Sequence, residues 1–459
     1  MSLFFQNHRS LQCRPGVLLL LGICWALGCK LEEYNSMPPL DAFYFPSSLT
    51  YIERAEGGEG ILLVANANFD KRYKHGSVVA VDLLALGEGG LPAFGEVEGV
   101  PKQIRELNIR PENALRVSSF TGRMGAYALP GGGALRFFLP SRSEGALLHV
   151  MDMDIPRGVE ALHLRCVPKP AKEESDCTQT ALSLTANEEV AAKKGLPRAP
   201  SPGFAVVSPE GEVWLTHIDA ADSPVGTAEN HISYAIRLSA MEPQLTDEAF
   251  IPIGAYPSAA ALVLGEWILL TGRGGAPVLR MLSKVEEGRV ENANVESSLR
   301  ISEGRDIVLS SDRKQVFLLG RYPDTFLVLY LNESTSPPSL QVVREIPLPE
   351  GPNALHILQR EGQGDLVAIL SSTSSALSFY DQDAGLLTGQ LAFVGKGPFS
   401  IASSKRGGGA RLFIGNFGDG RIAVVDVVDL KRPQDARLVA FLGKSQECLV
   451  QDTECEEEP

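Results

Sequence analysis

The sequence predicts an all-β protein, a seven-bladed β-propeller of four-stranded antiparallel blades. Short runs of β-branched and aromatic residues alternate with Gly, Asp and Asn turns along most of the 459 residues, as is typical of strands. A strand–loop–strand pattern recurs, and from Ile236 to Val425 its period is about 45–50 residues, in the range of propeller blades. Helical periodicity is scarce, and residues 187–195 (NEEVAAKKG) are the best helix candidate.

The clearest repeat copies stand near the two ends of the chain. The first joins residues 60–68 (GILLVANAN) to 76–83 (GSVVAVDL), and the last covers residues 410–427 (ARLFIGNFGDGRIAVVDV). Both consist of a strand, a polar loop and a second strand that closes on an Asp. Weaker copies lie between them, with strand pairs at residues 135–139 and 147–152, 212–216 and 232–238, 266–271 and 278–282, 315–320 and 326–331, and 365–370 and 376–381. Together they make seven copies.

Each copy leaves room for a fourth strand, such as residues 343–348 or 390–394. One such sheet cannot bury both of its faces, whereas radial packing of seven sheets buries face against face. Residues 437–442 are expected to form the closing strand. As an alternative, residues 42–45 could close the ring by pairing the two ends of the chain in one blade.

These repeats resemble the YVTN/YncE-like family of bacterial β-propeller proteins. The similar segments are residues 60–83 and 410–427, together with the lead-in GKGPFSIA at residues 395–402. The resemblance implies a seven-bladed propeller. It implies no activity, because this fold hosts enzymes, binding modules and scaffolds alike.

The beginning of the chain has the layout of an export signal. Arg9 and Arg14 precede an apolar run at residues 17–25, which is too short for a stable membrane-spanning helix. The ending Ala26-Leu27-Gly28-Cys29 resembles the lipobox of bacterial lipoproteins, which implies cleavage before Cys29 and acylation of that residue. An ordinary secretory signal cut nearby, or an uncleaved anchor, is the alternative.

The expected organisation follows from this signal. Residues 1–28 form the signal peptide, 29–45 a tether, 46–445 the propeller with an insertion at about 155–200, and 446–459 an acidic tail closed by a disulfide. We expect the exported chain to be lipid-anchored at the cell envelope. Lys30 gives no inner-membrane retention cue, so the outer membrane is favoured.

The charge of the chain disfavours some partners. The formal net charge is −14, and residues 1–28 carry two cations, Arg9 and Arg14, and no acidic residue, so their removal gives −16. An acidic chain is repelled by nucleic acid and by anionic membrane surfaces. The expected partners are therefore the membrane, through lipid on Cys29, and an envelope protein or peptide.

The cysteines agree with export. Of seven, Cys13 and Cys24 lie in the signal and Cys29 takes the lipid. The remaining four form two local pairs, which predict the disulfides Cys166–Cys177 and Cys448–Cys455. A metal site is the alternative, but neither pair has CxxC spacing.

Catalytic signatures are missing from the sequence. It contains no GxSxG elbow, HExxH, P-loop or EF-hand spacing, and we predict no catalytic residue, metal ligand or cofactor. His217 and His231 flank an acidic hairpin but fit no ligand pattern. The Asp residues that close strands (Asp82, Asp152, Asp381 and Asp426) recur from blade to blade, which indicates a role in turns.

Candidate ligand-binding residues follow from the expected architecture. In related propellers, the loop before each innermost strand lines one mouth of the central channel. Here these loops carry Arg116, Tyr256, Arg305, Asp306, Asn353, Lys396 and Phe399. Mixed charge with two aromatic rings suits a polar small molecule or a peptide. A water-filled funnel without a ligand is the alternative.

Three functions are compatible with this pattern. The first is a non-enzymatic binding or assembly platform at the envelope. The second is a propeller enzyme, lactonase-like or a quinone-dependent oxidoreductase, with its site in the funnel. A quinone site needs a stacking Trp, but Trp214 and Trp267 lie inside strand patterns, which indicates core packing. The third is a surface adhesin or sensor with the Cys166–Cys177 loop at its tip.

Overall fold

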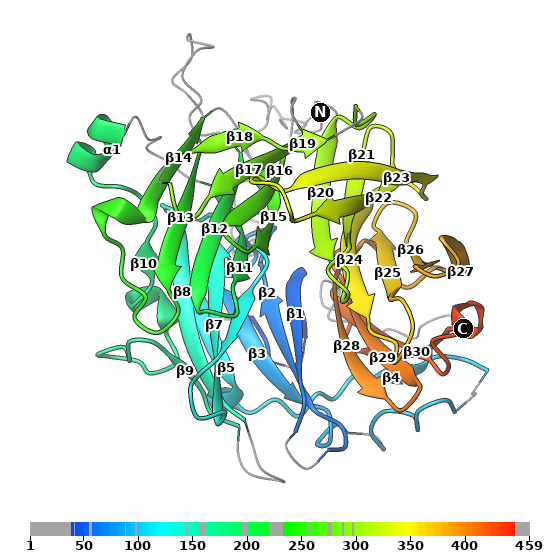
Figure 1. Ribbon diagram of the computed structural model, residues 1–459. Helices are drawn as coiled ribbons and strands as arrows, with labels where there is room; N and C mark the ends of the chain where they lie inside the picture. Colours follow the sequence, from blue (N-terminus) through cyan, green and yellow to red (C-terminus); the bar gives the residue numbers. More distant parts are fainter. Residues whose placement is uncertain are drawn as a thin grey trace, which may run out of the picture.

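Seven β-sheets surround a central axis in the computed structural model of the chain (Figure 1). The structure describes residues 38–40, 42–54, 57–87, 89–96, 99–143, 145–155, 162–194, 201–219, 233–254, 258–272, 278–286, 289–295 and 298–445. The predicted positions Cys29, Tyr256, Cys448 and Cys455 lie outside these residues. The predicted all-β, seven-bladed propeller is confirmed.

The first four blades follow one another along the chain. Blade 1 contains β1 (Pro46–Ile52), β2 (Ile61–Asn66), β3 (Gly76–Asp82) and β5 (Ala114–Val117). Blade 2 contains β6 (Gly125–Ala128), β7 (Ala134–Ser141), β8 (Leu147–Asp154), β9 (Leu164–Cys166) and β10 (Leu182–Ser183). Blade 3 contains β11 (Ser201–Val207), β12 (Glu212–Asp219), β13 (Ser233–Ser239) and β14 (Phe250–Gly254). Blade 4 contains β15 (Ser258–Leu264), β16 (Trp267–Gly272), β17 (Leu279–Ser283) and β18 (Val290–Asn292).

The last three blades complete the ring. Blade 5 contains β20 (Glu303–Leu309), β21 (Gln315–Arg321), β22 (Thr325–Asn332) and β23 (Ser339–Pro347), with β19 (Asn294–Val295) added in parallel to β23. Blade 6 contains β24 (Pro352–Leu358), β25 (Leu366–Ser371), β26 (Ala376–Asp381) and β27 (Leu386–Ala392). Blade 7 contains β28 (Pro398–Arg406), β29 (Gly409–Asn416), β30 (Arg421–Val427) and β31 (Arg437–Leu442), with β4 (Lys102–Ile104) added at its outer edge. Three blades thus have a fifth strand beyond the predicted four.

The core is divided among the seven contacts between neighbouring blades. Each of the hydrophobic clusters formed by the described residues draws its side chains from two adjacent blades, and blades 7 and 1 share one as well. The second strands β2, β16, β25 and β29 are buried along their whole length because each is covered on both faces. A blade therefore depends on its neighbours for burial, as radial repetition requires.

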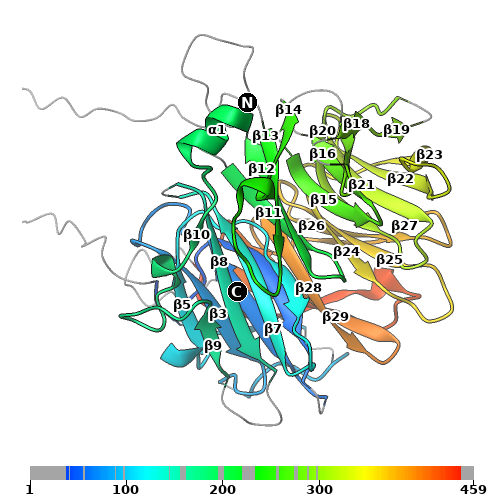
Figure 2. The same ribbon diagram turned by 60° about the vertical axis from the view of Figure 1, so that its left-hand side comes forward.

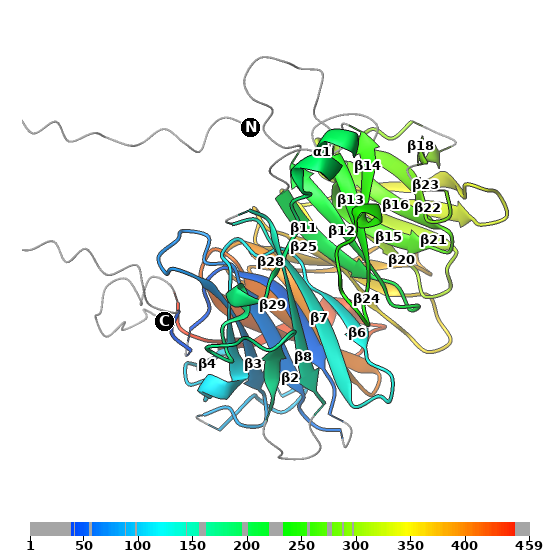
Figure 3. The ribbon, with the colours of Figure 1, turned by 90° about the vertical axis from the view of Figure 1, so that its left-hand side faces the viewer.

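The seam between blades 1 and 7 is closed by a segment of blade 1. The chain between β3 and β5 reaches over to blade 7, where β4 pairs in parallel with β31, placing Lys102 opposite Ala440 and Ile104 opposite Leu442. The innermost strands β1 and β28 contact each other at this seam, and Figure 3 shows the blue strands of blade 1 beside the orange strands of blade 7. Residues 42–45 do not supply a strand, which corrects that alternative. Phe43 and Tyr44, at the end of the expected tether, are instead buried against the propeller.

The inserted segment after β8 completes blade 2. Its strands β9 and β10 both pair with β8, and it carries the helix α1 (Glu188–Lys194), as predicted for residues 187–195. Val190 of α1 packs into the apolar cluster between blades 2 and 3, on the outside of the ring (Figure 2). Short 3₁₀ helices cover η1 (Pro111–Asn113), η2 (Cys177–Gln179), η3 (Asp247–Ala249) and η4 (Pro433–Asp435).

The recurring aspartates at the ends of third strands stabilise turns and hold arginines. Asp82 accepts a hydrogen bond from the Leu84 N–H, and Asp381 accepts from the N–H groups two and three residues later, which confirms the predicted turn role for both. Each of the four is also paired with an arginine of its own blade: Asp82 with Arg54, Asp152 with Arg136, Asp381 with Arg360 and Asp426 with Arg411.

Within the part of the chain that the structure describes, no helix has the length and apolar character needed to cross a membrane.

Candidate functional site

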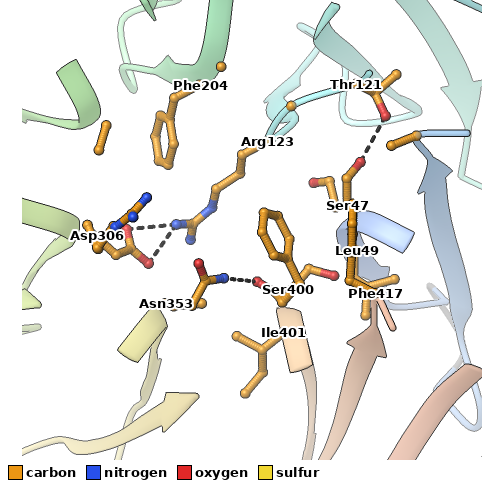
Figure 4. Close-up of a pocket in the computed structure, with 18 of the residues that line it drawn as sticks. Ser47, Leu49, Thr121, Arg123, Phe204, Asp306, Asn353, Ser400, Ile401 and Phe417 are labelled. Carbon is orange, nitrogen blue, oxygen red and sulfur yellow. Dashed lines mark hydrogen bonds and ion pairs between the residues drawn. The ribbon is translucent and has the colours of Figure 1, made fainter. Parts of the chain in front are cut away.

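A cavity of about 280 Å³ lies on the propeller axis, and every blade contributes to its lining (Figure 4). Its walls are formed mainly by the first residues of the innermost strands. The lining residues are Ser47, Ser48, Leu49, Ala67, Phe69, Thr121, Gly122, Arg123, Arg142, Gly203, Phe204, Ala259, Arg305, Asp306, Asn353, Ala354, Phe399, Ser400, Ile401 and Phe417. A volume of this size suits a small organic ligand.

A β-bulge at the start of the innermost strand contributes a lining residue in most blades. The register shifts there in six blades, leaving one residue of each innermost strand unpaired. Bulges of this kind redirect a side chain, and they are common beside functional sites. All six unpaired residues line the cavity: Ser47, Gly203, Ala259, Arg305, Asn353 and Phe399.

An ion pair crosses the channel between blades that are not neighbours. The Nη1 atom of Arg123, just before β6, lies 2.8 Å from both carboxylate oxygens of Asp306 on β20. Asp306 also accepts from the N–H groups of Ile307 and Leu355. The carboxylate is buried, whereas Arg123 is 37% exposed and stacks 4.9 Å from the centre of the Phe204 ring.

Five phenylalanines gather at the mouth of the channel. Phe417 is central, with ring centroids 4.9 Å from Phe45, 5.5 Å from Phe69 and 5.0 Å from Phe399. Phe69 also contacts Phe120 at 5.2 Å. Exposed fractions of 47% for Phe69 and 38% for Phe399 leave an apolar surface open at this mouth.

Two of these rings are carried by left-handed backbone. The φ angle is 55° at Phe45 and 57° at Phe120, a conformation that costs an L-residue roughly 1–2 kcal/mol. Strain of this type is often concentrated at binding sites. The rings are thus fixed in place at the mouth by the surrounding fold.

Polar groups at the cavity wall are mostly engaged with one another. Ser47 and Thr121 share a 2.8 Å hydrogen bond between their hydroxyls, and Asn353 donates its side-chain N–H to the Phe399 carbonyl at 2.9 Å. Arg305 lies 3.1 Å from Glu303. Such a wall offers an incoming ligand few polar groups without an existing interaction, so its open part is chiefly aromatic.

The structure brings four of the predicted funnel residues together: Arg305, Asp306, Asn353 and Phe399 all line the cavity. Lys396 is exposed on the loop before β28 and is not among the lining residues. Arg116 does not belong to the mouth either, which corrects its assignment. It lies on β5, an outer strand of blade 1, where it pairs with Glu173 and Asp176.

Sequence reasoning missed Arg123 and the phenylalanines at positions 45, 69, 120 and 417. One signal could have found the bulge residues. A proline occupies the first or second position of several innermost strands, at Pro46, Pro202, Pro352 and Pro398, because a residue without an N–H is tolerated there. The residue that follows each of these prolines is the unpaired one.

His149 and His217 are buried and His356 is half-buried, and all three are neutral parts of the fold. Burial lowers the pKa of His149 to about 4, and its Nε2 accepts the Ser118 N–H while Nδ1 faces the Cys177 carbonyl. Burial lowers the pKa of His217 to about 3, and its ring packs against Tyr234. Burial and the nearby Arg123 charge lower the pKa of His356 to about 4.

Other predicted elements can be placed as well. Cys166 and Cys177 form the predicted disulfide. Trp214 and Trp267 are buried in the contacts between blades, which confirms their interpretation as core residues. Among the described residues, no group of three or more His, Cys, Asp or Glu side chains is arranged to hold a metal ion.

No family model matches the sequence, and no curated protein matches it. Among solved structures, the chain is similar to Kuenenia stuttgartiensis hydrazine synthase, with 12% identity over 84% of this chain and 96% of that chain and a TM-score of 0.49. It is similar to the β-propeller domain of Cps50 (Swd1) from Myceliophteria thermophila, with 11% identity over 82% and 94% of the two chains and a TM-score of 0.48. It is also similar to the periplasmic gluconolactonase PpgL of Pseudomonas aeruginosa, with 16% identity over 77% and 86% and a TM-score of 0.47.

These similarities carry no information about activity. The strand order in the sheets and the residues that line the cavity define the class of the protein. It is a seven-bladed β-propeller with an aromatic-lined axial cavity.

Proposed function

We propose that the protein is a non-enzymatic binding propeller of the cell envelope, whose channel mouth takes a small ligand through an apolar group. The observation that carries this proposal is the open phenylalanine surface at the cavity, fixed by left-handed backbone at Phe45 and Phe120. Exposed aromatic rings around a concave site are typical of ligand recognition.

The rigidity of the wall supports ligand binding. The Arg123–Asp306 pair, the Ser47–Thr121 hydrogen bond and the Asn353–Phe399 hydrogen bond join different blades across or around the axis. Such a wall is organised before the ligand arrives, so little ordering opposes binding.

One hydroxyl–imidazole pair could suggest an enzyme. His356 Nε2 lies 2.7 Å from Ser403 Oγ, the contact that a general base makes with a nucleophile. Neither side chain is among those that line the axial cavity. The bond joins β24 to β28, so we assign it to the contact between blades 6 and 7.

The binding proposal is tested with Nile red, a neutral fluorophore that brightens in apolar sites. We expect saturable binding to the wild type, and at least five-fold weaker binding to Phe69→Ala and Phe417→Ala. Phe393→Ala is the matched control, because Phe393 is also exposed but does not line the cavity. Thermal unfolding of each variant shows whether the fold is kept. Equal affinities in all four proteins would refute the site.

The envelope location is a separate part of the proposal, supported by the export signal and the lipobox-like ending at Cys29. Several acyl chains would make the anchor durable, since one alone binds a membrane only marginally. Cells fed radiolabelled palmitate should incorporate label into the wild type and not into Cys29→Ser. Label in both, or in neither, would remove the anchor from the proposal.

A further inference from the structure

A second cavity of about 420 Å³ lies beside the channel mouth, between blades 1 and 2. Four basic side chains line it, Lys71, Lys74, His75 and Arg142, together with the hydroxyl-bearing Ser119 and Ser143. None of the described lining residues is Asp or Glu. So dense a group of basic side chains is unusual in a chain of net charge −14.

The backbone of the loop that carries three of these basic residues is held rigidly. The side-chain N–H₂ of Asn68 donates to the Tyr73 carbonyl at 2.6 Å and to Ser119 Oγ at 2.9 Å, while its oxygen accepts the Tyr73 N–H at 3.1 Å. Lys71 has a left-handed backbone with φ of 56°, and its ammonium lies 5.3 Å from the centre of the Phe120 ring. The cationic groups are therefore presented by a loop of fixed shape.

Nearby carboxylates are engaged elsewhere. Asp70, in the same loop, lies 3.2 Å from Arg72, so these two charges offset each other. Asp176 accepts from Thr178 and Gln179 and pairs with Arg116. Among the described residues, no carboxylate is paired with the ammonium groups of Lys71 and Lys74. Oxyanions bind ammonium and hydroxyl donors of this kind.

The basic pocket and the axial cavity meet. Arg142 lines both of them, and Phe120 lines the pocket while its ring contacts Phe69 of the channel mouth. We propose that the basic pocket binds the oxyanion, a carboxylate or a phosphate, of an organic ligand whose apolar part lies against the phenylalanines. The placement of the apolar part depends on the proposed function, whereas the oxyanion site is independent of it.

Calorimetric titration with four probes tests this inference: phenyl phosphate, 3-phenylpropionate, the neutral 3-phenylpropan-1-ol and inorganic phosphate. We expect both aromatic anions to bind the wild type at least ten-fold more tightly than the neutral alcohol, and added salt to reduce this preference. The double variant Lys71→Gln/Lys74→Gln should bring the three aromatic probes to within two-fold of one another. Lys431→Gln, an exposed lysine of blade 7, is the control and should behave as the wild type.

The outcomes separate the two proposals. Equal affinity for anionic and neutral probes in the wild type, or a preference kept by the double variant, overturns the oxyanion site. In a third outcome, inorganic phosphate binds the wild type but not the double variant, and no aromatic probe binds more tightly than phosphate. This result supports the oxyanion site and refutes its link to the channel. No binding of any probe refutes both. Circular dichroism and thermal unfolding confirm that the double variant is folded, since both lysines are exposed.

Discussion

Arg123 and Asp306, 183 positions apart in the sequence, face each other across the axis of the ring, with a guanidinium nitrogen 2.8 Å from each carboxylate oxygen. Blades 2 and 5 do not share a hydrophobic cluster, so this contact ties together parts of the ring that packing leaves separate. It also forms part of the cavity wall (Figure 4).

Replacing Arg123 with Met should lower the free energy of unfolding by about 1–3 kcal/mol, because the buried Asp306 carboxylate loses its partner. Partial exposure of Arg123 keeps the loss below that for a fully buried pair. Urea unfolding measures it. Arg165→Gln, which breaks an exposed pair with Asp154, is the control and should cost at most about 1 kcal/mol. If both variants lose the same free energy of unfolding, the Arg123–Asp306 pair contributes no more than an exposed ion pair.

Arg411 should matter more for stability. Its guanidinium is fully buried, contacts Asp426 at 2.7 and 2.9 Å, and reaches Glu59 and the Pro92 carbonyl of blade 1. Arg411→Met should cost about 3–5 kcal/mol, since a buried carboxylate is left uncompensated. Adding Asp426→Asn should restore part of this loss. A double variant less stable than Arg411→Met would contradict the argument.

Stability should fall as pH is lowered through the range in which histidine titrates. The pKa of His149 is about 4 in the folded protein and 6.5 as its ordinary value. Between these values the unfolded state binds the proton and the folded state does not, so the full stability is present above pH 6.5 and decreases toward pH 4. Over this pH range the pKa difference corresponds to a decrease in the free energy of unfolding on the order of 3 kcal/mol. Urea midpoints measured from pH 7 to pH 4 should fall less steeply in His149→Gln; an unchanged slope would exclude His149 as a source.

The disulfide should stabilise blade 2 and its buried histidine together. Cys166 and Cys177 enclose a loop of sequence separation 11, and closing a loop of this length contributes roughly 2–3 kcal/mol by its effect on the unfolded chain. Cys166→Ser/Cys177→Ser should lower the unfolding midpoint accordingly. The Cys177 carbonyl also faces His149 Nδ1. If the loop moves away in this variant, the imidazole becomes less buried, its folded pKa rises toward 6.5 and the pH dependence of stability weakens. A lower midpoint with unaltered pH dependence would mean that the loop stays in place without the bond.

Gly395 and Gly407 provide a matched pair at left-handed positions. Both have positive φ, 113° and 54°. A Cβ on Gly395 would lie 2.1 Å from the Asn416 side chain, which donates to the Val394 carbonyl, whereas a Cβ on Gly407 meets open space. Gly407→Ala should therefore cost only the conformational term, about 1 kcal/mol, and Gly395→Ala at least about 2 kcal/mol. Thermal unfolding compares them; similar shifts would show that Asn416 moves aside freely.

The blades were predictable because their signal is local. Alternating apolar strands and Asp-closed turns recur within a few tens of residues, so the strand pairs around β2–β3 and β29–β30 could be recognised without long-range information. The closing strand at residues 437–442 was predicted with the bounds that β31 has. The bulge residues Arg305, Asn353 and Phe399 were reached through the loops before the innermost strands.

What could not be predicted depends on weak or distant signals. The pattern misplaces Arg116 and does not reveal Arg123, because the innermost strand of blade 2, β6, has only four residues and begins at Gly125. The strand β4 has three residues, no periodicity of its own and a parallel partner in another blade. The phenylalanine cluster combines loop residues with Phe399 of β28. Its members are far apart in the sequence, so no local pattern predicts that they meet.

The strand β4 also has a consequence for how the ring is made. Its neighbour Gly95 donates to Asp426, 331 residues further along the chain, so this part of blade 1 is synthesised long before its partners emerge from the ribosome. Until then blade 1 lacks its covering on one side. A nascent chain that ends before β28 therefore lacks the whole of blade 7, and the apolar faces of blades 1 and 6 that blade 7 covers in the finished protein are exposed to solvent and to chaperones.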